Sequence, residues 1–206
     1  MAASGRRSSL LYASEYHHRL IVVGTTGSGK TTLALQLAGL LEIPHIELDA
    51  LYWEPNWTPA PLEVFRERVA QALERETWVA DGNYSSARDL IWGRADMLIW
   101  LDYALPLLFW RLLKRGLQRS FAKTHLWNGN RESLRGMFLS PNSLFLYALK
   151  THFSRRKEYP AAFARPEHAH LTVIHLRSPR ATEDWLASLP PATLTDQDAS
   201  LAPQET

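Results

Sequence analysis

Short apolar runs rich in β-branched residues recur along the chain, at residues 20–23, 43–49, 78–84, 95–102 and 171–176. Runs of this length and composition are typical of strands buried in a parallel sheet. The run at 43–49 combines a linker with a short strand, and the run at 95–102 is the most apolar. We therefore expect five strands, with the fourth at the centre of the sheet.

Between these runs, apolar residues recur at helical spacing. Helices are predicted at 31–41, 62–76, 107–119, 142–158 and 181–189, with a shorter one at 85–92. Pro106 suits the first position of a helix, and Thr182 is a candidate N-cap for the last one. Strands alternating with helices predict an α/β fold, a doubly wound three-layer sandwich with a parallel five-stranded sheet.

The folded region is expected to span residues 19–189. Residues 1–18 have no apolar core of signal-peptide length and predict a disordered N-terminal extension, and the Pro- and Ala-rich residues 190–206 predict a flexible tail. The chain of 206 residues has no cysteine, and its most apolar window, 97–113, contains Asp102, Pro106 and Arg111. We expect one domain in a protein without membrane spans, located in the cytoplasm.

Residues 24–31 match the phosphate-binding pattern G-x-x-x-x-G-K-[ST], between a predicted strand and a predicted helix. The glycines allow backbone N–H groups to converge on an anion at the helix N-terminus. Lys30 would bridge the β- and γ-phosphates of ATP, and the Thr31 hydroxyl would complete the coordination of Mg²⁺. The predicted ATP-binding residues of this loop are Gly24, Gly27, Ser28, Gly29, Lys30, Thr31 and Thr32.

Three acids end predicted strands, namely Asp49, Asp81 and Asp102. Ligands of open parallel sheets bind outside the carboxyl ends of the strands, so each acid is expected near the phosphate site. Asp81 and Asp102 are both candidates for the metal on this pattern alone. Asp49 is a candidate for the second substrate or, alternatively, a cap of the following turn.

The chain has a formal net charge of +2, but residues 111–157 hold eleven Lys or Arg against one acid, a local net charge of +10. Such a segment attracts polyanions, either nucleotide phosphates or nucleic acid. Residues 51–61 hold three aromatic residues and three prolines, too many prolines for regular structure. Tyr52, Trp53 and Trp57 are expected either to cover a planar substrate or to fill the edge of the core.

Several nucleotide-binding classes are excluded by missing motifs. The chain has neither the N-K-x-D nor the D-x-x-G sequence of GTPases, and no glutamate follows Asp81 or Asp102 as in motor or transporter ATPases. Small-molecule kinases are then the leading class.

The phosphate loop, residues 43–53, residues 78–84 and the basic residues 154–157 resemble the adenylate-kinase-like proteins often labelled bacterial DNA topology modulation (FlaR-like) proteins. The resemblance covers about residues 19–189. It implies a nucleoside-monophosphate-kinase-like fold with strand order 2-3-1-4-5 and a helical basic lid at about 120–157. The chain departs from adenylate kinases after the third strand, where it has Asp81-Gly82-Asn83-Tyr84 in place of Asp-Gly-Phe-Pro-Arg.

The resemblance also implies roles for single residues. The acid ending the third strand, Asp81, is preferred over Asp102 for the metal, and Asp49 would contact the acceptor hydroxyl. Arg111 and Arg115, one turn apart, would lie against the adenine and the phosphates. Lid arginines would offset the charge on the transferred phosphoryl group. The candidates for this last role are Arg131, Arg135, Arg155 and Arg156.

The sequence thus predicts an Mg²⁺-dependent phosphotransferase that moves the γ-phosphate of ATP to a small acceptor. The alternative is an ATP-binding regulator that binds nucleic acid through its basic segment and has little kinase activity.

Overall fold

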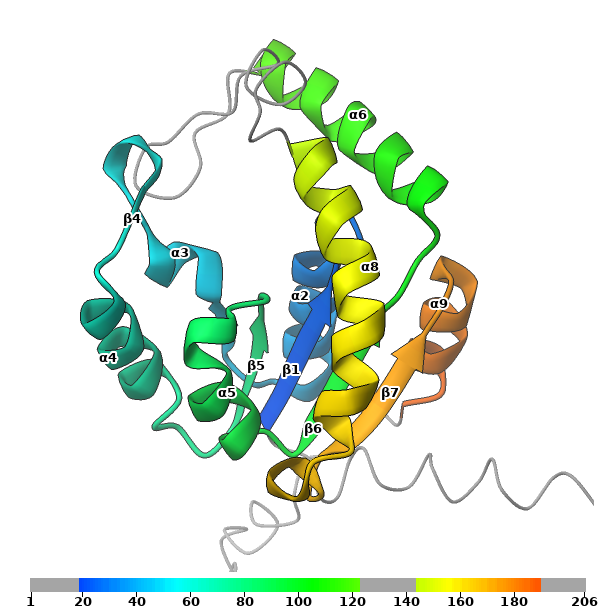
Figure 1. Cartoon of the computed structure of the whole chain (residues 1–206). Coiled ribbons are helices and arrows are strands. Elements are labelled where there is room, and N and C mark those ends of the chain that lie inside the picture. Colours follow the sequence, from blue (N-terminus) through cyan, green and yellow to red (C-terminus); the bar gives the residue numbers. More distant parts are fainter. Residues whose placement is uncertain (1–18, 123–143, 190–206) are drawn as a thin grey trace, which may run out of the picture.

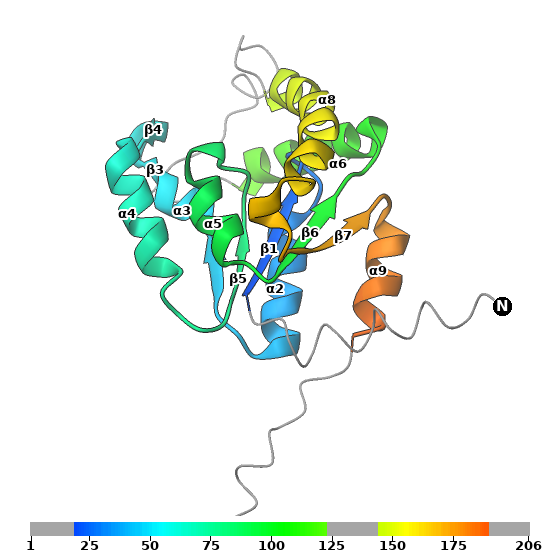
Figure 2. The same cartoon turned by 60° about the horizontal axis from the view of Figure 1, so that its bottom comes forward.

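A computed structural model describes residues 19–122 and 144–189, and its main element is a parallel sheet of five strands (Figures 1 and 2). The sheet order is β2-β5-β1-β6-β7. Counted within this sheet alone, the order is 2-3-1-4-5, and the fold is the predicted α/β sandwich. The strands are β1 (Arg19–Gly24), β2 (His45–Glu47), β5 (Trp78–Asp81), β6 (Met97–Leu101) and β7 (Thr172–Leu176).

A second, two-stranded sheet was not predicted from the sequence. It pairs β3 (Trp53–Glu54) with β4 (Thr58–Pro59) in antiparallel fashion around the 3₁₀ turn η1 (Pro55–Trp57). Prolines are tolerated here because the pairing is only two residues long and lies at an edge. The expectation that residues 51–61 lack regular structure is therefore wrong.

Helices cover both faces of the main sheet because successive side chains of its strands point to opposite sides. Leu20 and Val22 of β1 belong to the core under α2 and α9, whereas Ile21 and Val23 belong to the core under α3, α4, α5 and the C-terminal half of α8. The helices are α2 (Lys30–Leu41), α3 (Leu48–Tyr52), α4 (Leu62–Ala72), α5 (Arg88–Arg94), α6 (Leu105–Ala122), α8 (Leu144–Phe163) and α9 (Pro179–Ala187), with 3₁₀ turns η2 (Ser85–Ala87) and η4 (Pro166–His168).

The start of α9 corrects the cap predicted from the sequence. Ser178, not Thr182, is the N-cap, and its hydroxyl accepts a hydrogen bond of 3.1 Å from the backbone N–H of Ala181. Pro179 follows as the first helical residue, which is the favoured order of cap and proline. Thr182 lies inside the helix, where its hydroxyl bonds with the Tyr103 hydroxyl at 2.6 Å.

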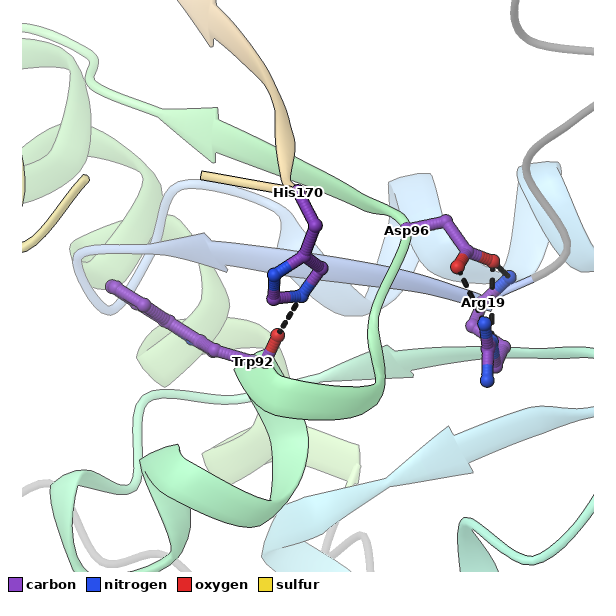
Figure 3. A network of polar contacts seen from close by, with 4 residues as sticks. All are labelled: Arg19, Trp92, Asp96 and His170. Atoms are coloured by element: carbon purple, nitrogen blue, oxygen red, sulfur yellow. Dashed lines mark hydrogen bonds and ion pairs between the residues drawn. The ribbon is translucent and has the colours of Figure 1, made fainter. Parts of the chain in front are cut away.

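Polar contacts tie down the edge of the sheet at which the strands begin (Figure 3). The Asp96 carboxylate, just before β6, accepts hydrogen bonds from the backbone N–H of Arg19 at 3.0 Å and from its guanidinium at 2.7 and 3.2 Å. His170 Nε2 donates to the Trp92 carbonyl at 3.1 Å. The first contact joins β1 to the segment before β6, and the second joins α5 to the segment before β7. Both lie at the edge where the strands begin, so the opposite, carboxyl edge is left for a site.

Three predicted regions lie partly or wholly outside the described residues. These are the N-terminal extension 1–18, the tail 190–206 and the greater part of the lid-like segment 120–157, including Arg131 and Arg135. Within residues 19–122 and 144–189, no helix is both long and apolar enough to cross a membrane.

Candidate functional site

The phosphate loop joins the carboxyl end of β1 to the first residue of α2. Gly24 has φ +154°, and a Cβ there would lie 2.6 Å from the Leu101 carbonyl oxygen and 2.8 Å from Ser28 Oγ. Gly29, the N-cap residue of α2, has φ +92° in the left-handed region. Glycine is required at both positions, and the first N–H groups of α2 face outward without helical partners. The loop is shaped for an anion.

Two residues outside the loop hold its backbone in place. Asn83 Nδ2 donates to the Gly24 carbonyl at 2.6 Å, and Asn83 Oδ1 accepts from the Gly24 N–H at 3.0 Å. On the other side, Arg111 Nη1 of α6 donates to the Ser28 carbonyl at 2.9 Å, and its guanidinium lies 5.3 Å from the Tyr103 ring centroid. The loop is therefore held from the segment after β5 and from α6.

Thr31 and Asp81 meet at the start of α2. Thr31 Oγ1 donates to Asp81 Oδ2 at 2.7 Å, and His45 Nε2 donates to Asp81 Oδ1 at 2.8 Å. Asp81, the last residue of β5, is only 3% exposed. A hydroxyl and a carboxylate side by side suit Mg²⁺, which takes one or two protein oxygens and fills its octahedron with water and phosphate. The described residues hold no cluster of three or more His, Asp or Glu that could bind a metal alone.

Asp102 is engaged elsewhere at the same edge. Its Oδ1 accepts from Arg156 Nε at 2.7 Å, and its Oδ2 accepts from His175 Nε2 at 3.0 Å. The His175 ring in turn stacks on Trp100, with centroids 4.1 Å apart. Both carboxylate oxygens of Asp102 thus connect β6 to α8 and β7. The hydrogen bond with Thr31 is made by Asp81, and the preference for Asp81 over Asp102 as the metal ligand stays a prediction.

Lys30 lies among four charged residues. Burial lowers its pKa, the carboxylates of Asp49 and Asp81 raise it, and the cations Arg155 and Arg115 lower it further. Arg115 lies one turn after Arg111 on α6, so the predicted arginine pair faces the loop and the lysine that it carries. The segments predicted to form the nucleotide site are brought together, while their roles stay predictions.

Asp49 occupies a different element from the one predicted. β2 ends at Glu47, and Asp49 lies in the first turn of the five-residue helix α3. Its carboxylate accepts a hydrogen bond from the Tyr84 hydroxyl. The pKa of Tyr84 is raised, first by burial and then by the Asp49 charge, so the phenol stays a proton donor. The strand ends early, yet the carboxylate still reaches the vicinity of Lys30.

The two candidate lid arginines of α8 have different surroundings. Arg156 is paired with Asp102. Arg155 is only 8% exposed, and among the described residues its buried Nη1 has no hydrogen-bond partner. A buried, unsatisfied guanidinium nitrogen costs free energy unless a ligand completes it. Of the two residues, Arg155 is therefore the better candidate to bind an anion.

Several residues of the site were not singled out from the sequence. Asn83 and Tyr84 lie two and three residues after Asp81, and the run Asp-Gly-Asn-Tyr at a strand end is a signal that the sequence contains. His45 and Tyr159 had no such signal, because their contacts join segments that are distant in the sequence. His45 binds Asp81, and the Tyr159 hydroxyl donates to Asn83 Oδ1 at 3.1 Å. Arg88 of α5 is the fifth residue that was not singled out. It lines a small cavity together with Asn83, Tyr84 and Tyr159.

Of the aromatic residues in 52–57, Tyr52 packs against the edge of the core. Tyr52 packs on Phe65 and Tyr84, with ring centroids 5.1 and 4.6 Å apart, and Trp53 packs edge-on against Trp57. Of the two predicted roles, covering a planar substrate or filling the edge of the core, the second therefore describes Tyr52 best. Tyr52 also buttresses the phenol that holds Asp49.

Comparison with known proteins places the fold. No protein-family model matches the chain, and no curated protein is significantly similar to it. The solved structure of a shikimate kinase from Acinetobacter baumannii in complex with shikimate superposes with a TM-score of 0.50 and 19% identity, covering 84% of this chain and 91% of that one. The chain has the fold of the P-loop kinases.

Two further solved structures are similar at a lower level. They are a sugar kinase from Janibacter sp. HTCC2649, with a TM-score of 0.49 and 20% identity over 83% of this chain and 91% of that one, and a gluconokinase from Sinorhizobium meliloti 1021, with 0.48 and 18% over 84% and 93%. None of the three supports the FlaR-like group in particular. That finer assignment stays a prediction.

Proposed function

We propose that this protein is an ATP- and Mg²⁺-dependent phosphotransferase acting on a small acceptor. The observation that carries the proposal is the contact of Thr31 with Asp81 beside Lys30, at the mouth of a loop shaped for phosphate. Because one fold serves many functions, the shared fold alone does not carry it.

On the nucleotide side, the amides of residues 24–32 and the Lys30 ammonium would hold the β- and γ-phosphates. Thr31 and Asp81 would hold Mg²⁺, which neutralises charge on the phosphates when bound. His45 fixes the second Asp81 oxygen, so the carboxylate keeps one orientation. Arg111 and Arg115 would bind the nucleotide from α6.

On the acceptor side, Asp49 would accept the proton of the acceptor hydroxyl, and Tyr84 would hold the carboxylate in place. Arg155 is buried, and its charge lowers the pKa of Lys30. It would stabilise charge on the moving phosphoryl group through Nη1, which has no hydrogen-bond partner in the described part of the chain. Phosphoryl transfer depends mainly on positioning and electrostatics, and these residues would supply both.

The test is acceptor-stimulated ADP release, measured with Mg-ATP and a panel of nucleoside monophosphates, sugars and shikimate-like hydroxy acids. Asp49→Asn should lower the stimulated rate by about 10²-fold or more while ATP binding stays unchanged, because a general base contributes on that order. Asp89→Asn is the matched control, since Asp89 is an exposed acid paired with Arg66 on the outer surface.

An ADP release that no acceptor stimulates would contradict the proposal. Stimulation by duplex DNA alone would instead favour the alternative, a nucleic-acid-associated regulator. Of the basic segment 111–157 behind that alternative, residues 123–143, with three of its eleven Lys or Arg, lie outside the described residues.

A further inference from the structure

Large apolar side chains are exposed on two neighbouring helices, α6 and α8. Among the described residues, eight large apolar side chains are exposed, and only Leu35 of α2 and Leu62 of α4 lie elsewhere. Single exposed apolar residues are ordinary on a protein surface, whereas a group of them marks a place of contact. The six on α6 and α8 are 39–62% exposed and are Trp110, Leu117, Leu146, Tyr147, Leu149 and Phe153.

The outer face of α6 is apolar over two turns. Leu108 and Leu112 are fully buried and lie against Gly27 of the phosphate loop. Successive residues of a helix point about 100° apart, so Trp110 and Leu117 lie on the opposite side of α6. A helix that covers a protein with one side normally carries polar residues on the other, so this second apolar side needs a reason of its own.

α8 continues the apolar face of α6. The two helices lie side by side (Figures 1 and 2) and touch through Phe109 and Phe145, whose ring centroids are 5.3 Å apart. Leu149 and Phe153 follow Phe145 at intervals of one turn and lead from this contact to the outer side of α8, away from the fully buried Ala148. The exposed apolar residues of both helices therefore form one surface, which we call the outer face.

The outer face is also basic. Lys114 of α6 and Lys150 and Lys157 of α8 are exposed, and in the described part of the chain they form no ion pair. The two helices together hold eight Lys or Arg against a single acid, Glu158, which is a net charge of +7. The whole chain has a net charge of +2, so all other residues together carry −5. The positive charge of the protein is thus concentrated on the helices that expose the apolar residues.

This combination decides between the possible occupants of the outer face. A second copy of the chain would bring two positively charged faces together, and like charges across an interface repel each other. An anionic membrane suits both features, because Trp, Phe and Leu enter the boundary between head groups and acyl chains while lysines reach the negative head groups. Two adjoining helices also offer a broad surface to a bilayer.

We propose that the outer face docks on an anionic membrane surface, with Trp110 and Phe153 inserted at the boundary and the three lysines at the head groups. The inference goes beyond the proposed function and does not rest on it. The inner sides of the same helices carry Arg111, which holds the phosphate loop, and the buried Arg155. Docking would therefore leave the candidate site on the other side of both helices.

The test is co-sedimentation of the full chain with vesicles of phosphatidylcholine, either alone or mixed with phosphatidylglycerol. The protein should bind the mixed vesicles and not the neutral ones. Phe153→Ser and Trp110→Ser should each weaken this binding by about ten-fold or more, the loss expected when one large apolar side chain is no longer buried. Lys150→Gln should weaken it by about five-fold, the share of one lysine at an anionic surface.

Two variants serve as matched controls. Leu62→Ser removes an exposed apolar side chain of α4, and Arg75→Gln removes an exposed cation outside both helices. Both should bind the mixed vesicles as the wild type does. Phe153→Ser should unfold at the same urea concentration as Leu62→Ser, which separates loss of docking from loss of fold.

Equal binding of the mixed vesicles by Phe153→Ser and the wild type would overturn the inference, and so would equal binding of neutral and mixed vesicles. A wild type that ignores vesicles but forms a dimer that Trp110→Ser dissociates would assign the outer face to a second copy. A wild type that ignores vesicles, with Phe153→Ser markedly less stable than Leu62→Ser, would assign it to another segment of this chain. Either result would contradict membrane docking.

Discussion

At the scale of single residues, Lys30 is the position at which stability and function oppose each other. Burial lowers the pKa of its ammonium, although Asp49 and Asp81 favour the charged form. A cation whose pKa falls on folding costs free energy of folding as long as it stays charged. The charged lysine therefore lowers the stability of the fold, which we interpret as the cost of a position suited to bind a ligand.

Lys30→Met should abolish ATP binding without lowering the free energy of unfolding of the ligand-free protein at pH 7. The pKa of Lys30 is lower in the folded chain than its ordinary value of 10.5, so the unfolded state binds more protons between the two values. The wild type should thus gain stability relative to the variant as the pH rises toward 10.5. Urea unfolding at pH 7 and pH 10 measures both effects.

The control for this experiment is Lys114→Met, which removes an exposed lysine of α6 and should show neither effect. A Lys30→Met protein that is less stable than the wild type by more than about 1 kcal/mol at pH 7 would mean that the ammonium supports the fold, contrary to the account.

Residues of the site differ in how far the sequence revealed them. The phosphate loop and Asp81 were readable because a local motif and a strand end specify them. His45, Arg88 and Tyr159 were not, because each acquires its neighbours only when separate segments meet in the fold. Asp49 was singled out as the end of a strand, whereas it lies in α3, and its role stays a prediction.

At the scale of elements, α8 carries two adjacent arginines with different partners. Arg156 connects the helix to Asp102 just after β6, whereas Arg155 is buried and its charge acts on the pKa of Lys30. Neighbouring residues of a helix point about 100° apart, so one helix can be fastened by one arginine and present the other to the site. The sequence alone could not separate their roles.

Arg155→Met should lower acceptor-stimulated ADP release by about 10²-fold or more with little change in melting temperature, since removal of one charge-stabilising donor costs on that order. Arg156→Met should leave the rate within a few-fold and lower stability by about 1 kcal/mol, because its guanidinium is partly exposed and Asp102 keeps His175. Steady-state kinetics and thermal unfolding of both variants measure the contrast. The reverse pattern would assign the catalytic role to Arg156.

Elements were predictable where they are long and periodic. The apolar runs that became β1 and β6 and the pattern that became α2 follow from burial on a parallel sheet. The hairpin β3-β4 and the helix α3 were missed because they are only two and five residues long. Packing of Tyr52 on Phe65, rather than local propensity, holds that region.

At the scale of the whole molecule, one edge of the sheet is held together by polar contacts and the other carries the candidate site. The edge where the strands begin is joined by Arg19, Asp96 and His170 (Figure 3), whereas loops from β1, β5 and β6 converge on charged residues at the other edge. Parallel strands bring their carboxyl ends to one place, so residues far apart in the sequence form one site. This arrangement was predictable from the alternation of strands and helices.

The central claim is that the γ-phosphate of ATP moves to a small acceptor at this edge. Transfer of label from γ-labelled ATP, followed across nucleoside monophosphates, sugars and shikimate-like hydroxy acids, tests it most directly. The account predicts a labelled acceptor with the wild type, and loss of that label on chelation of Mg²⁺ and in Lys30→Met. Label found only in inorganic phosphate, whatever the acceptor, would contradict it.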